Sequence, residues 1–182
     1  MSVVRRLLVS AIVLGLVGTL TGVGTYAAFF STASTDGDVY RAGTVYVSDD
    51  DAGSLVLDVS GIRPTDPAVS GCIVVSYGGS LPASAVLYGT SSGALAAFLD
   101  VTVTEGTGGT FGSCAGFVPS ATLYSGTLAA FPTTWAGGLA DADGTWTTGE
   151  SHAYRFEISL QDDPAAQGQS GSASFTWEAR NQ

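Results

Sequence analysis

The chain has 182 residues, of which 45% are apolar and 12% are charged, with 16 acidic side chains against six basic ones. All six basic residues are arginine, and lysine is absent. Proteins bind nucleic acids by neutralising phosphates with lysine and arginine, so this charge balance excludes nucleic-acid binding. The apolar content argues against intrinsic disorder. One histidine and two cysteines leave little for a soft-metal centre or a histidine-based catalytic triad.

The N-terminus has the pattern of an export signal. Two arginines lie in residues 1–6, and an uncharged apolar run follows at 7–17. Thr25 and Ala27 place small side chains at the −3 and −1 positions of a signal peptidase site, so we expect cleavage between Ala27 and Ala28. This predicts a signal peptide of residues 1–27 and a secreted mature chain of residues 28–182, in contact with the membrane only before cleavage. The alternative is an uncleaved anchor, since residues 7–30 carry no charge.

Cys72 and Cys114 are the only cysteines of the chain. Outside the cytoplasm a lone pair normally oxidises, so we expect a structural disulfide between them. A reactive thiol or a metal-binding pair is the alternative, but the chain has neither CxxC spacing nor a nearby histidine to support it.

Apolar and polar residues alternate with a period of two along the mature chain, a pattern that predicts half-buried strands. The clearest candidates are residues 99–104, 154–160 and 174–178. Weaker candidates are 44–48, 55–59, 72–77, 84–88 and 121–125. Clusters rich in glycine, aspartate and serine predict turns at 78–80, 107–109 and 141–144, and one helical turn each is expected within 94–99 and 126–131.

Eight or nine short strands imply one all-β domain, a jelly-roll-like antiparallel β-sandwich over residues 28–182. We expect Trp135, Trp146 and Trp177 to contribute to its core, because buried aromatic rings dominate core energetics. A ligand platform is the alternative use for these rings.

Several segments carry a resemblance to a known family. A glycine-rich stretch with aromatic residues, GVGTYAAFFS at 22–31, is followed by TDGDVYRAGTV at 35–45. Further segments lie at 122–128, 149–156 and 166–179. In order and spacing these resemble the TasA/camelysin family of secreted matrix and spore-coat-associated proteins, which a dedicated signal peptidase processes. The cysteine pair and the absence of lysine depart from the family's pattern.

The resemblance implies a secreted structural subunit of a biofilm-matrix or cell-surface fibre, which assembles with copies of itself or with related matrix subunits. In TasA-like proteins the freed N-terminal segment enters the sheet of the next subunit as a donor strand. Here the candidate donor is residues 28–34, with Phe29 and Ser31 on one face and Phe30 on the other. The alternative is an ordinary first strand that pairs within its own sheet.

Two other functions are alternatives to the fibre subunit. A non-polymerising surface module that binds carbohydrate or protein would suit the same fold. A camelysin-like metallopeptidase would need two histidines in an HExxH arrangement, but the chain has only His152, interpreted as a surface residue on the polar face of the strand at 154–160. We therefore expect no enzyme, with no catalytic or cofactor-binding residues.

Acidic clusters at 49–51, 141–143 and 162–163 are expected in turns, where aspartate caps backbone amides. Carboxylates of an extracellular protein also suit calcium. The best candidate ligands are Asp49, Asp51 and Asp58, although the EF-hand spacing is absent.

Overall fold

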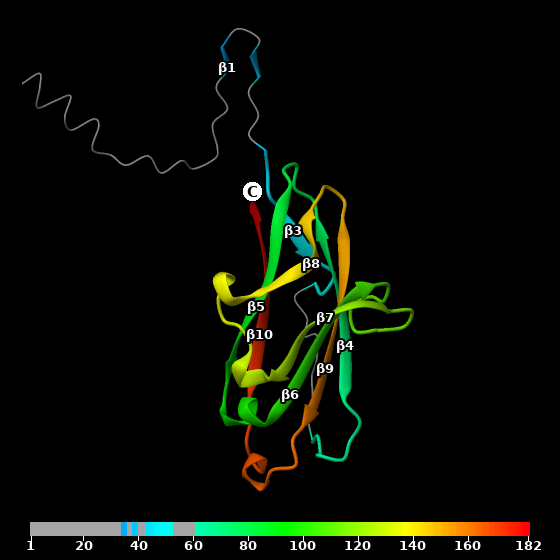
Figure 1. Ribbon diagram of the computed structural model, residues 1–182, viewed down its shortest axis with the longest axis vertical. Coiled ribbons are helices and arrows are strands. Elements are labelled where there is room, and N and C mark those ends of the chain that lie inside the picture. The colour runs from blue at the N-terminus through cyan, green and yellow to red at the C-terminus, as the bar shows by residue number, and fades with distance from the viewer. Residues whose placement is uncertain (1–33, 36–37, 40–42, 53–60) are drawn as a thin grey trace, which may run out of the picture. The chain divides into compact units, whose positions relative to one another are not determined.

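The computed structural model describes residues 34–35, 38–39, 43–52 and 61–182 (Figure 1). The expected cleavage site at Ala27 and Ala28 lies outside the described residues, as do the donor residues Phe29, Phe30 and Ser31. The predicted strand at 55–59, which includes Asp58, lies outside them too. Among the described residues, no helix is long and apolar enough to cross a membrane.

The chain divides into two units, Met1–Ala42 and Gly43–Gln182. The described part of the first unit is a short antiparallel pair. Its strands are β1 (Ser34–Thr35) and β2 (Asp38–Val39).

The second unit contains two antiparallel sheets. The larger has the order β3-β4-β9-β6-β7, with the bounds β3 (Val47–Asp49), β4 (Val69–Tyr77), β9 (Ser151–Leu160), β6 (Leu99–Thr107) and β7 (Val118–Thr127). The smaller has the order β10-β5-β8, with the bounds β10 (Ser172–Asn181), β5 (Ala83–Ser92) and β8 (Leu139–Trp146). The remaining elements are single 3-10 turns: η1 (Ala94–Phe98), η2 (Leu128–Ala130), η3 (Trp135–Gly137) and η4 (Pro164–Ala166).

The antiparallel β-sandwich predicted from the sequence is confirmed. From β4 onward the chain crosses repeatedly from one sheet to the other, so that β9 comes to lie between β4 and β6 (Figure 1). The three clearest sequence patterns correspond to β6, β9 and β10, and the expected helical turns correspond to η1 and η2.

The core lies between the sheets and is rich in aromatic rings. The ring of Tyr154 on β9 lies 5.3 Å from that of Trp177 on β10. Phe156, two residues along β9, lies 4.5 Å from Phe175. Trp146 at the end of β8 is completely buried. These contacts join strands of opposite sheets, so the alternating residues of β9 and β10 supply the hydrophobic driving force for closure.

Two expectations about this fold need correction. The aspartate cluster at 141–144 was predicted as a turn between strands, but it lies within the bounds of β8, where it forms the irregular part of the register that has no partner on β5. Trp135 was expected in the core, but it lies half-exposed in η3, with the guanidinium of Arg180 over its ring at 4.3 Å from the centroid. The guanidinium over the indole face gives this half-exposed ring a favourable cation–π contact.

Candidate functional site

His152 is buried, which corrects its interpretation as a surface residue. Its exposed fraction is 7%, and it lies in β9 two residues before Tyr154. Residues two apart on a strand share a face, so His152 belongs to the same inward row as Tyr154 and Phe156. The sequence-based prediction therefore assigned His152 to the wrong face of the strand.

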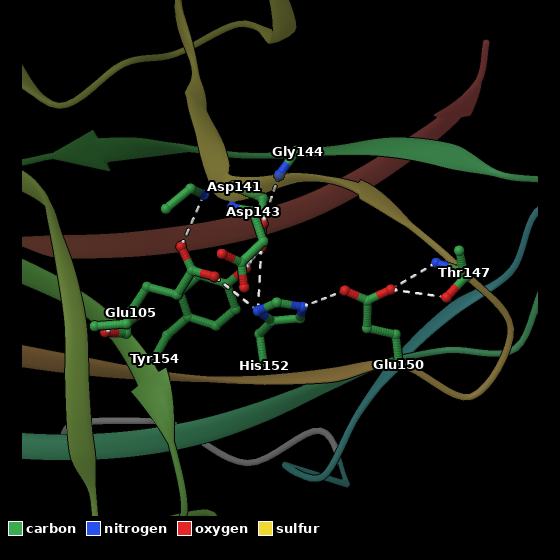
Figure 2. A network of polar contacts seen from close by, with 10 residues as sticks. Glu105, Asp141, Asp143, Gly144, Thr147, Glu150, His152 and Tyr154 are labelled. Carbon is green, nitrogen blue, oxygen red and sulfur yellow. Dashed lines mark hydrogen bonds and ion pairs between the residues drawn. The ribbon is translucent and has the colours of Figure 1, made fainter.

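The imidazole of His152 is surrounded by three carboxylates (Figure 2). Its Nδ1 lies 2.7 Å from Glu105 Oε1 and 3.4 Å from Asp141 Oδ2. Its Nε2 lies 3.0 Å from Glu150 Oε1. We call Glu105, Asp141, Glu150 and His152 the His152 cluster. The indole of Trp146 stacks on the imidazole, with a centroid distance of 4.6 Å and an interplanar angle of 18°.

The cluster connects the two sheets. Glu105 lies on β6 and His152 on β9, both in the five-stranded sheet, whereas Asp141 lies on β8 in the three-stranded sheet. The hydroxyl of Tyr154 donates to Asp141 Oδ2 at 3.3 Å and adds a second polar contact across the same gap. Polar groups at this depth cost free energy unless they are paired, and here each carboxylate has partners.

Backbone amides of β8 hold the two most buried carboxylates in place. The amide of Ala142 donates to Glu105 Oε2 at 3.0 Å. The amides of Asp143 and Gly144 donate to Asp141 Oδ1 at 2.8 and 3.2 Å. Asp141 therefore does cap backbone amides, as the sequence predicts, but it does so from a buried position in a strand.

Glu150 occupies the turn that precedes β9 and is the most accessible member of the cluster. Its Oε2 accepts hydrogen bonds from the backbone amide of Thr147 at 2.7 Å and from the Thr147 hydroxyl at 3.0 Å. These bonds, the amide bond first, lower the pKa of Glu150 below its ordinary value. Glu150 therefore faces His152 as a negative charge.

The pKa values of the two central groups are raised. Burial alone would lower the pKa of His152, but the hydrogen bond that its ring donates to Glu150 and the charges of Asp141 and Glu105 outweigh burial and raise the pKa. For Glu105, burial is the main cause of a raised pKa, and the adjacent Asp141 adds to it. Glu105 and His152 therefore bind protons more tightly than the same groups would in water, whereas Glu150 binds its proton less tightly.

Three members of the His152 cluster, together with Asp143, have the spacing of a cation site. Glu105, Asp141, Asp143 and His152 each offer a ligand atom, and these atoms lie within 4.8 Å of one another. The Nδ1 atom and the buried oxygens, however, already make the hydrogen bonds described above. Because these atoms are already engaged with one another, we interpret the cluster as a hydrogen-bonded network that holds protons. The second histidine that an HExxH peptidase needs is absent from the sequence.

The predicted calcium residues are only partly described. Asp49 ends β3, and its Oδ1 accepts a hydrogen bond from the amide of Asp51 at 3.4 Å, while Asp58 lies outside the described residues. Burial and the neighbouring Asp51 raise the pKa of Asp49. The calcium site therefore stays a prediction.

The middle residue of this triplet has a role that sequence reasoning missed. Asp50 Oδ1 accepts a hydrogen bond from the amide of Val74, and its Oδ2 accepts one from the amide of Phe111, both at 2.8 Å. One carboxylate thus joins β4 to the loop between β6 and β7. The expectation that aspartates in such clusters cap backbone amides holds here across a long sequence separation.

The predicted disulfide is confirmed. Cys72 on β4 is bonded to Cys114 in the loop between β6 and β7, with a Cα–Cα distance of 5.2 Å. Next to it the amide of Gly112 donates to the carbonyl oxygen of Cys72 at 3.0 Å. The disulfide and the two bonds of Asp50 fasten the same loop to the sheet.

No family model matches the chain, and no curated protein matches it. The resemblance to the TasA/camelysin family therefore stays a prediction from the motifs.

Proposed function

We propose that the protein is a secreted structural subunit of an extracellular-matrix or cell-surface fibre. In this proposal residues 28–34 of one copy, freed by signal peptidase, add as a strand to a sheet edge of the next copy. The observation that carries the proposal is the long edge strand β10. The sequence resemblance identifies the donor segment, and the edge of β10 is the surface to which that segment would bind.

Strand β10 forms one edge of the three-stranded sheet. It pairs with β5 over its whole length, from Ser172↔Ser92 to Asn181↔Ala83 (Figure 1). Among the described strands it has no second partner. A regular ten-residue edge offers a row of unpaired backbone donors and acceptors, which is the template for adding another strand.

The side chains of β10 favour an apolar partner. Phe175 and Trp177 point toward the core but stay only partly buried in the described structure. The candidate donor is uncharged and carries Phe29 and Phe30. A donor strand added along β10 would bury its own phenylalanine rings beside the partly buried rings of β10. Its backbone would complete the hydrogen bonds of the sheet edge.

The geometry of such a contact leads to a fibre. The donor and the edge are different surfaces, so each bound copy still presents a free edge to the next one. Head-to-tail contacts of this kind generate open filaments unless they close into a ring. The acidic chain, with a net charge of −10, would favour solubility before assembly.

The proposal is tested by electron microscopy and sedimentation of the mature protein. Residues 28–182 should form filaments, and residues 35–182 should remain monomeric. The matched control keeps the length and changes only the apolar character, through Phe29→Ser with Phe30→Ser, and should assemble weakly or not at all. Filaments from residues 35–182 would exclude the donor role. A monomeric mature protein would favour the surface-module alternative.

A further inference from the structure

We propose that the His152 cluster is a proton-controlled tie between the two sheets. Protonated, it holds strand β8 against β6 and β9. When the surroundings become alkaline it releases β8 and loosens that side of the sandwich.

The charges of the cluster favour one retained proton. The side chains of Glu105 and Asp141 are each 1% exposed, and that of His152 is 8% exposed. A protonated imidazole between them is a buried cation that pairs with buried anions. Loss of that proton leaves carboxylates facing one another at low dielectric, which is far more costly than the same repulsion in water.

Among the described residues, no arginine is paired with a carboxylate of the cluster. The chain has no lysine. In the part of the chain that the structure describes, the two arginines of β9 and β10 pair elsewhere: Arg155 with Glu157 at 3.0 Å and Arg180 with Glu178 at 2.7 Å. The imidazole is thus the positive partner of this cluster within the described residues.

The groups that face His152 from the surrounding elements are carboxylates, which stabilise the protonated ring, or neutral side chains. Strand β6 presents Glu105, β8 presents Asp141 with Asp143 beside it, and the turn before β9 presents Glu150. Tyr154 on β9 itself faces Asp141, and burial raises the pKa of its phenol, so it stays neutral. The ring face of His152 is covered by Trp146.

The direction of the effect follows from the shifted groups. The pKa of His152 is raised above 6.5, so its contribution to stability is complete below that value and is lost as pH rises through the folded pKa. The pKa of Glu105 is also raised, above 4.5, and its contribution likewise falls as pH rises. Glu150 acts oppositely: its lowered pKa gives stability above 4.5 that is lost toward acid.

Strand β8 is the element most able to respond. It is an edge strand that pairs only with β5 among the described strands, and its register with β5 shifts between Ser84 and Val86. The bonds that reach it from the five-stranded sheet include those of Glu105, His152 and Tyr154. Loss of the proton therefore weakens its attachment to the facing sheet.

The only histidine of the chain gives a single imidazole signal, so the test needs no assignment of overlapping resonances. We would titrate that signal by NMR in the secreted protein and measure amide-exchange protection factors of β8 and β4 at each pH. The imidazole midpoint should lie above 6.5, and the protection of β8 should fall at least tenfold through the same midpoint while β4 changes little.

Three variants test whether the attachment of β8 depends on the protonation of His152 or only on side-chain packing. Glu105→Gln and Asp141→Asn should move the imidazole midpoint downward, and the opening of β8 should follow it. Glu150→Gln, at the accessible end of the cluster, should also move the midpoint downward and keeps the test available if a buried variant fails to fold. Glu157→Gln, whose carboxylate pairs with Arg155, is the matched control and should leave the midpoint unchanged.

The proposal would be overturned by an imidazole midpoint at or below 6.5, or by β8 protection that does not change through the titration. The titration is repeated with a chelator, which should not move the midpoint. A midpoint that moves on chelation would show a bound metal in place of the proton.

Discussion

Asp50 joins two segments that are distant in sequence through one carboxylate. Its two oxygens accept the amides of Val74 and Phe111, each at 2.8 Å. Hydrogen bonds to a charged acceptor are stronger than neutral ones, although the exposure of Asp50 reduces their net contribution. We expect Asp50→Ala to lower the free energy of unfolding by about 1–2 kcal/mol. Urea denaturation of this variant measures the loss.

The control for Asp50 is Asp162→Ala, which removes an exposed carboxylate from a turn. It should leave the unfolding midpoint almost unchanged. Equal midpoints for both variants would show that the two bonds of Asp50 contribute nothing measurable.

The sequence is sufficient to predict that Glu105 and His152 are buried, but it does not predict which groups they contact. Glu105 extends the inward row of Val101 and Val103, and His152 extends that of Tyr154. Two ionisable groups at inward strand positions are unusual enough to indicate a buried pair. Their partner Asp141 could not be found in this way, because it comes from the other sheet and only the tertiary fold brings it close.

At the scale of elements, the disulfide fastens the loop between β6 and β7 to β4. It closes a segment with a sequence separation of 42 residues, for which the chain-entropy account gives about 4 kcal/mol. We expect the double variant Cys72→Ala with Cys114→Ala to lower the free energy of unfolding by about 2–4 kcal/mol. Denaturation with and without a reducing agent measures this.

Reduction of the unaltered protein should reproduce most of that loss, and the reducing agent should have no effect on the double variant. An unaltered protein that keeps its midpoint after complete reduction would contradict the assigned role. If reduction lowers the amide-exchange protection of the loop and of no other segment, the disulfide stabilises only the loop.

Strands differ in how far the sequence predicts them. β9 and β10 follow from their alternating apolar residues, although the pattern marks only 154–160 of β9 and 174–178 of β10 and leaves their remaining residues unassigned. β8 was missed because its Asp141, Asp143 and Gly144 have the local preferences of a turn. Residues 141–144 fall in the irregularity of the register between β8 and β5, so their turn preferences are expressed as a bulge between the paired ends of the strand. Local propensity therefore identifies the bulge and misses the paired residues on either side of it.

At the scale of the whole molecule, the period-two pattern predicts the all-β class but not the strand order. The neighbours of β9 are β4 and β6, which lie far from it in the sequence. Such non-local pairings depend on which faces and edges fit together after the chain collapses. The sequence does not predict which strands lie at the edges of the sheets, and it is the fold that places β10 at an edge, along with β3, β7 and β8.

The central claim is that the outer edge of β10 receives a strand from another copy. Hydrogen exchange of the β10 amides, read by mass spectrometry in filaments of residues 28–182 and in the truncated chain 35–182, tests this directly. We predict slow exchange on the outer edge of β10 in the filament and fast exchange in the truncated chain. Equally slow exchange in both would show that the chain covers this edge itself, and fast exchange in the filament would show that assembly uses another surface.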